Sequence, residues 1–129
     1  MQVDDRLGSF ADVVAAAPRH GDLMGALRNL AHSLHPDGVE TASALERSVS
    51  WGFAGGKMQH WYAYLRPYAA HVNLGFFQGY RLPDPAGVLM GTGVKLRHVK
   101  LRQAGEAAAL ALADLMIAAQ AERRAALSL

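Results

Sequence analysis

The sequence contains no cysteine among its 129 residues. This absence excludes disulfide bonds, thiolate metal sites, iron–sulfur clusters and cysteine nucleophiles. A metal ion would need histidine, aspartate or glutamate ligands. We therefore expect no cysteine-based catalysis, so that any chemistry depends on the other polar side chains. We also expect neither a cofactor nor a metal site, because the spacing of the histidines and acidic residues does not indicate a ligand set.

Long apolar runs are also missing. The most apolar stretch, Ala107 to Ala121, covers 15 residues and contains Asp114, whereas a membrane-spanning helix needs about 20 apolar residues. The first residues are acidic and are not followed by the apolar segment of a secretory signal. The sequence thus predicts a cytoplasmic protein that does not enter a membrane.

The composition is that of an ordinary globular chain, with 51% hydrophobic and 19% charged residues. A chain of this length can bury one core, so we expect a single domain at 1–129. The charge is unevenly distributed: residues 65–129 hold eight Lys and Arg against four Asp and Glu, a net charge of +4. Most of this excess lies between Lys95 and Arg102.

Apolar residues at helical spacing predict two helices near the N-terminus. The first runs from Ser9, a favourable N-cap, to Ala17 and is stopped by Pro18. The second begins near Asp22 and ends before the turn sequence at 36–38. Alanine-rich sequence predicts a third, long helix at 104–125.

Between these helices, polar and apolar residues alternate as they do in strands. Aromatic and β-branched residues mark strands at 60–65 and 71–77, joined by a hairpin turn. Further strands are predicted at 39–42, 49–53 and 96–101. We therefore expect an α+β fold: a two-layer sandwich with an antiparallel sheet of about five strands, N-terminal helices and a long C-terminal helix.

Three blocks of the second half resemble the YdhG-like family, a domain of unknown function. They are HVNLGFFQG from His71, LPDPAGVL from Leu82 and GTGVKLRHVKLR from Gly91. The resemblance extends more weakly over nearly the whole chain. It implies one YdhG-like domain, similar in layout to secretion-chaperone and frataxin-like domains. It implies no agreed reaction or cofactor, and a shared fold does not by itself transmit function.

A glycine-containing basic segment is the strongest candidate for a binding site. Gly91 and Gly93 could turn backbone N–H groups toward one point, and the cations that follow could hold a phosphate or carboxylate there. The spacing of a phosphate-binding P-loop is absent. The candidate ligand-binding residues of this segment are Thr92, Lys95, Arg97, His98 and Lys100. The alternative is that the glycines only form a turn and the charged side chains protect a strand edge.

A second candidate surface is centred on His71 and Asn73, which share one face of their predicted strand. If the neighbouring strand places His60, Tyr62 and Tyr64 on that face, the surface would suit a small planar or anionic ligand. The alternative is that the two side chains make hydrogen bonds at the turn and the sheet edge.

These patterns favour a non-enzymatic binding module for an anionic small molecule or an acidic segment of a partner. Lys95, Arg97 and Lys100 would supply the charge, and His71 and Asn73 would orient the ligand. The G-x-S-x-G motif of serine hydrolases is absent, and we expect no catalytic residue. We do not expect nucleic-acid binding, because the net charge of +2 provides no continuous basic stripe.

Two other functions remain open. The first is an intracellular iron carrier of frataxin-like layout, which would need clustered acidic residues that this sequence scatters. The second is a chaperone-like or homodimeric interaction protein with aromatic residues on its surface. Its candidate contact residues are Trp51, Trp61, Phe76 and Phe77.

Overall fold

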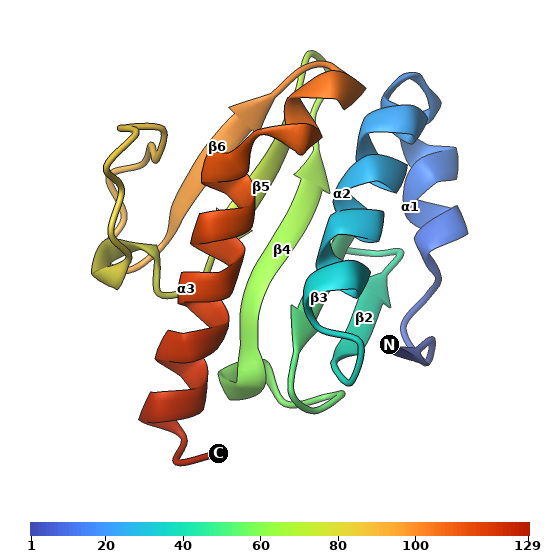
Figure 1. The fold of residues 1–129 in the computed structure, drawn as a ribbon. Helices are drawn as coiled ribbons and strands as arrows, with labels where there is room; N and C mark the ends of the chain where they lie inside the picture. The colour runs from blue at the N-terminus through green and yellow to red at the C-terminus, as the bar shows by residue number, and fades with distance from the viewer.

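Three α-helices cover one face of a six-stranded sheet in the computed structural model, which describes residues 1–129 (Figure 1). The helices are α1 (Phe10–Ala16), α2 (Gly21–Leu34) and α3 (Leu110–Ala126). The strands are β1 (Gln2–Asp4), β2 (Val39–Ser43), β3 (Ser48–Gly52), β4 (Trp61–Pro67), β5 (Val72–Phe76) and β6 (Arg97–Leu101). Short 3₁₀ helices occur at η1 (Pro18–His20), η2 (Met58–His60), η3 (Gly79–Arg81) and η4 (Ala104–Ala108).

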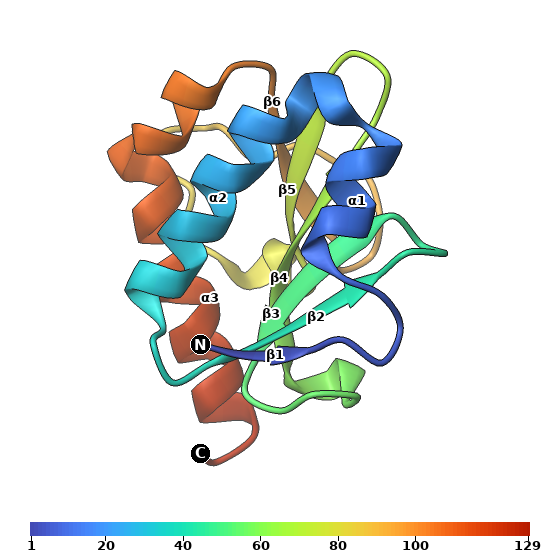
Figure 2. The same ribbon diagram turned by 90° about the vertical axis from the view of Figure 1, so that its right-hand side faces the viewer.

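The strands follow one another across the sheet in chain order, from β1 to β6. Neighbouring strands from β2 to β6 are antiparallel, whereas β1 runs parallel to β2. Figure 2 shows β1 beside β2 at the edge of the sheet. The predicted two-layer α+β sandwich is therefore confirmed, and the strand that the sequence did not indicate is β1.

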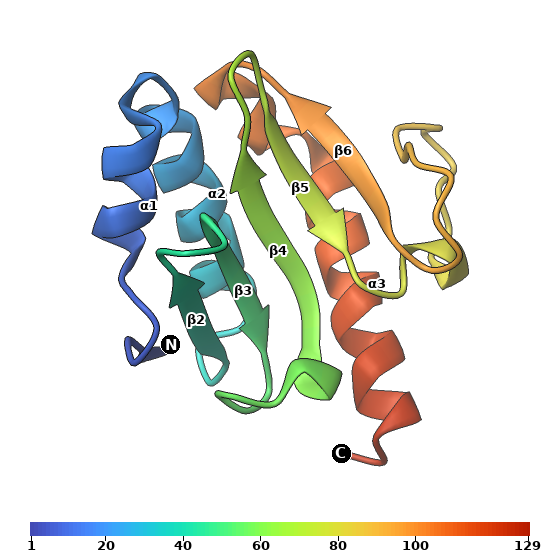
Figure 3. The same cartoon turned by 180° about the vertical axis from the view of Figure 1, so that it is seen from behind.

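The alternation of side chains along the strands separates a helix-covered face from an open face. Val49, Leu65, Leu74 and Val99 lie opposite one another in successive strands and are all buried under the helices. The helices contribute buried side chains to the same core, including Leu23, Met24, Leu27, Leu112, Leu115 and Met116. The view from behind shows the opposite face of the sheet without a covering layer (Figure 3).

Trp51 and Phe76 belong to the helix-covered face, and their exposed fraction is 0%. The prediction that both lie on the surface is therefore wrong. The register explains their burial, because both are cross-strand partners of buried Ala63. Of the four aromatic residues proposed for an interaction surface, Trp61 and Phe77 remain partly exposed.

An irregularity between Trp51 and Gly52 shifts the register of β3 against β4. Tyr62 therefore turns toward the helices, where its hydroxyl lies 2.9 Å from Nδ1 of buried His35. The predicted grouping of His60, Tyr62 and Tyr64 on one face is wrong, because Tyr62 is in the core and His60 lies in η2. A β-bulge changes the alternation on which that prediction depended.

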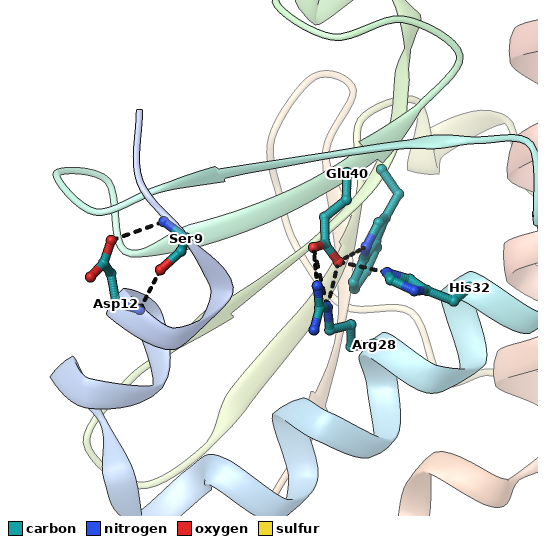
Figure 4. Close-up of polar contacts among 6 residues, drawn as sticks. Ser9, Asp12, Arg28, His32 and Glu40 are labelled. Carbon is teal, nitrogen blue, oxygen red and sulfur yellow. Dashed lines mark hydrogen bonds and ion pairs between the residues drawn. The ribbon is translucent and has the colours of Figure 1, made fainter. Parts of the chain in front are cut away.

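Side-chain capping boxes stabilise the starts of two helices, α1 and η4. Ser9 and Asp12 form a capping box at the start of α1, drawn in Figure 4. At the other end of the chain, the predicted helix at 104–125 is interrupted: η4 ends before Ala109, which has ψ 130°, and α3 begins at Leu110. A capping box between Gln103 and Glu106 stabilises the start of η4.

None of the helices combines the length and the apolar character needed to cross a membrane.

Candidate functional site on the open face of the sheet

Strands β4, β5 and β6 place three polar side chains in a row across the open face. Arg66 of β4 pairs with Asn73 of β5, and Asn73 pairs with Lys100 of β6. We call Arg66, Asn73 and Lys100 the cation row. The sequence prediction included Asn73 and Lys100 but missed Arg66, whose only signal is its alternation with the apolar Leu65 in a predicted strand.

Two histidines flank the cation row. His98 pairs with Gly75 in the next row of the open face, and His71 precedes β5, where its ring stacks on Tyr68 with centroids 5.0 Å apart. The structure therefore brings together four of the residues predicted from the sequence: His71, Asn73, His98 and Lys100. They come from two neighbouring strands and the turn before β5.

The cations of this surface have no acidic partners. The four ion pairs of the protein are Arg6–Asp4, Arg28–Glu40, His32–Glu40 and Arg123–Glu122, and none of them includes Arg66 or Lys100. The uncompensated charge also acts on the histidines. Burial lowers the pKa of His71, and the positive charges of Lys100, Arg102, His98 and His20 lower it further. Burial and the charge of Lys100 lower the pKa of His98 in the same way.

Three buried polar atoms on the open face have no hydrogen-bond partner in the protein: Thr41 Oγ1, Trp61 Nε1 and Asn73 Oδ1. Asn73 is only 9% exposed and lies between the two cations of its row. Buried polar atoms in proteins are nearly always hydrogen-bonded. Unpaired atoms on a face that no other layer covers are therefore candidates for contact with a ligand or partner.

An aromatic cluster lies beyond the cation row on the same face. The ring of Phe77 contacts those of Tyr64 and Trp61, with centroids 5.1 and 6.0 Å away. Gly75 makes room for this cluster: a Cβ atom at that position would lie 2.0 Å from Cζ of Tyr64. The open face thus has an aromatic part and a cationic part, with His98 next to the glycine that separates them.

The remaining predicted residues lie outside this surface. Thr92 and Lys95 are exposed in the loop before β6. Arg97 donates from Nη1 to the carbonyl oxygens of Gly93 and Leu96, at 2.6 and 2.7 Å, and so holds the loop that precedes it. These contacts give Arg97 a local structural role and direct its Nη1 group away from an external anion.

A buried carboxylate provides a second polar centre on the helix-covered side, which Figure 4 shows. Glu40 has an exposed fraction of 0% and accepts hydrogen bonds from Arg28, His32 and Trp51. Burial alone would raise the pKa of Glu40, but these hydrogen bonds outweigh it and leave the pKa below its ordinary value. A carboxylate with every oxygen engaged in this way is a structural anchor between β2 and α2, and it has no oxygen free to act as a general base.

No group of three His, Asp or Glu side chains lies close enough to hold a metal ion. His32 and His35, three residues apart in the sequence, have different partners: His32 contacts Glu40, and His35 contacts Tyr62. The iron-carrier alternative therefore has no candidate ligand set in this structure.

Protonation of the histidines should make stability depend on pH. Burial lowers the pKa of His35, as do the charges of Arg124 and the N-terminus, while Asp37 acts in the opposite direction. Folding lowers the pKa values of His35, His71 and His98 below 6.5, the ordinary pKa of histidine. Just below pH 6.5, the unfolded chain therefore binds more protons than the folded chain. We expect the free energy of unfolding to be nearly constant around neutral pH and to decrease as the pH falls below 6.5.

Urea denaturation at a series of pH values would measure this decrease, with His35→Asn as the matched variant because it keeps a polar atom near the Nδ1 position. The variant should show a smaller slope of stability against pH between about pH 6.5 and 5. An equal slope in both proteins, or a gain of stability on acidification, would contradict the assignment.

Comparison of the chain with protein families, with characterised proteins and with solved structures gave no match.

Proposed function

We propose that this domain is a binding module whose open sheet face receives an acidic, extended segment of a partner protein. The observation that carries the proposal is the cation row, in which Arg66 and Lys100 lie on either side of Asn73. Neither cation has an acidic partner within the chain. Both are therefore available for charge-assisted hydrogen bonds with carboxylates of a partner.

The shape of the face favours a peptide over an enclosed small molecule. Arg66 and Lys100 border two different hollows, and His71, Asn73 and His98 between them line none of the main ones. The residues of the face therefore do not share one concave site of the kind that holds a small molecule. The partly exposed rings of Trp61, Tyr64 and Phe77 offer apolar contact next to the cations. A segment that carries acidic residues beside an apolar one would match both parts of the face.

Self-association through this face is disfavoured by its charge, because two copies would bring cations against cations. The resemblance to the YdhG-like family supplies neither a ligand nor a reaction to the proposal. A chain without cysteine has no need of an oxidising compartment, and we propose that the binding takes place in the cytoplasm.

The proposal can be tested with a fluorescent peptide that contains several Glu residues and one Phe, titrated with the protein and followed by fluorescence anisotropy. We expect Lys100→Glu to weaken binding about tenfold, because it replaces a favourable charge in the row by an unfavourable one. Lys95→Glu makes the same change of charge in the loop outside the face and should leave the affinity within about twofold. Binding should also weaken as salt is added.

Three results would overturn the proposal. If Lys100→Glu and Lys95→Glu lose the same affinity for the peptide, the binding reflects the overall charge of the protein and not a site on the open face. A matched peptide with Gln in place of Glu that binds equally well would remove the role of the cations. A single-stranded oligonucleotide that binds more tightly than the peptide, and loses affinity in Lys100→Glu, would assign the face to nucleic acid.

A further inference from the structure

A hollow of about 570 Å³ lies where five segments meet: the end of α1, η1, the β2–β3 turn, the end of β4 and the β4–β5 turn. Three arginines from different segments line it. Arg19 comes from η1, Arg47 from the β2–β3 turn, and Arg66 from β4. We call this hollow the arginine groove.

The positive charge of the arginine groove is not compensated within the protein. No Asp or Glu lines it, and none of the three arginines takes part in an ion pair. Glu46 precedes Arg47 in the chain but neither lines the groove nor forms an ion pair. Three arginines around one hollow concentrate positive charge there, and a bound anion would compensate it.

Hydrogen bonds to the carbonyl oxygens of Tyr68 and Ala69 fix one wall of the groove. Arg19 donates from Nη1 to the carbonyl oxygen of Ala69 at 3.0 Å. The buried His20 donates from Nε2 to the carbonyl oxygen of Tyr68 at 2.8 Å. These contacts hold Arg19 against the β4–β5 turn while most of its N–H groups stay free, since a guanidinium has five donors.

Arg47 occupies a backbone conformation that favours glycine. Its φ is 53°, in the left-handed region that residues with a side chain rarely adopt. A glycine would satisfy this position of the β2–β3 turn at lower conformational cost. An arginine here therefore calls for another reason, and its position in the lining of the groove supplies one.

The rest of the lining is apolar and aromatic. Alanines and prolines from the end of α1, η1 and β4 contribute most of it. Tyr68 also lines the groove, and the central carbon of the Arg66 guanidinium lies 5.7 Å from its ring centroid. The volume of about 570 Å³ falls within the range of small-molecule sites.

We propose that the arginine groove binds a phosphate monoester that carries a small aromatic or apolar body. Arginine recognises phosphate through paired N–H donors, and a phosphate monoester presents three acceptor oxygens and nearly two negative charges at neutral pH. A carboxylate has one charge and two oxygens, so it can engage fewer of the three arginines. The apolar lining and the Tyr68 ring would contact the body of the ligand.

Isothermal titration calorimetry with phenyl phosphate tests this site, and Arg47→Gly is the decisive variant. We expect Arg47→Gly to weaken binding about tenfold by removing one charged donor pair. Its urea midpoint should be equal to or higher than that of the wild type, because glycine suits the positive φ. Ser128→Gly relieves a similar φ of 56° near the C-terminus and should leave the affinity unchanged.

Inorganic phosphate and benzoate separate the two parts of the ligand. Both should bind more weakly than phenyl phosphate, the first because it lacks the ring and the second because it lacks the phosphate. A short phosphotyrosine peptide shows whether the phosphate monoester belongs to a protein or to a free metabolite. Tighter binding than that of phenyl phosphate assigns the groove to a modified protein. Equal or weaker binding assigns it to a free metabolite. The phosphate monoester is supported in both cases.

The site is refuted if Arg47→Gly binds phenyl phosphate as well as the wild type does, or if benzoate binds equally tightly. An absence of measurable heat at millimolar phenyl phosphate would also refute it. Arg66 belongs to both the arginine groove and the cation row. The test varies Arg47 instead, which lies in the β2–β3 turn outside the cation row, so a failure of this proposal is distinguishable from a failure of the peptide-binding proposal.

Discussion

Replacing Glu40 by glutamine should lower the free energy of unfolding by about 3 kcal/mol, since breaking a buried ion pair leaves its partners without compensation. The carboxylate is fully buried and joins β2 to α2 through Arg28 and His32, while Trp51 donates to it from β3. Glutamine keeps the shape but has one acceptor oxygen, and its amide N–H groups would face the donors of Arg28. Urea denaturation measures the loss.

Glu46→Gln is the matched control for this change. Glu46 is exposed in the β2–β3 turn, and its carboxylate has no ion-pair partner. Its replacement should alter stability by no more than about 0.5 kcal/mol. If the two variants lose the same small amount, the Glu40 centre does not anchor the helical layer as described.

Replacing Gly52 by alanine should cost about 3 kcal/mol, because the new methyl group would overlap the backbone of the neighbouring strand segment. A Cβ atom at Gly52 would lie 2.4 Å from the carbonyl oxygen of His60 and 2.8 Å from Cα of Trp61. Both contacts are to backbone atoms, which cannot rotate away. Gly52 is also where the register of β3 against β4 shifts, so the strain falls on the bulge that orients Tyr62.

Replacing glycine by alanine should instead raise the free energy of unfolding at Gly25, in the middle of α2. A Cβ atom at Gly25 would have no neighbour within 4 Å apart from the backbone of its own helix, and alanine stabilises a helix relative to glycine by about 1 kcal/mol. Urea denaturation of Gly25→Ala and Gly52→Ala therefore compares one chemical change in two environments. A loss of stability in Gly25→Ala, or a neutral result in Gly52→Ala, would contradict the packing described here.

The strands and helices that were predictable have strong local periodicity. The aromatic and β-branched runs at 60–65 and 71–77 correspond to β4 and β5, and the apolar spacing after Asp22 corresponds to α2. The strand β1 has three residues and exists only through its pairing with β2, a contact between distant parts of the chain. The break in the helix at Ala109 was also not predictable from the sequence, because the alanine-rich residues on both sides of it favour a helix.

The composition of the open face was only partly predictable for similar reasons. Alternation identified His71 and Asn73 as neighbours on one face, and the register of β6 then added His98 and Lys100. Arg97 was indistinguishable from them by charge, yet it lies on the other side of its strand and bonds to its own loop. Contacts such as Arg28 with Glu40, between a helix and a strand, depend on tertiary packing and leave no local pattern.

The most direct test of the central proposal is a nuclear magnetic resonance titration of the ¹⁵N-labelled protein with the acidic peptide. The proposal predicts that the amide signals of Asn73, Gly75, His98 and Lys100 shift most, together with the indole signal of Trp61. Signals from α2 and α3, on the covered side of the sheet, should stay within error. Shifts confined to the helices, or to the loop that contains Thr92 and Lys95, would show that the open face is not the binding surface.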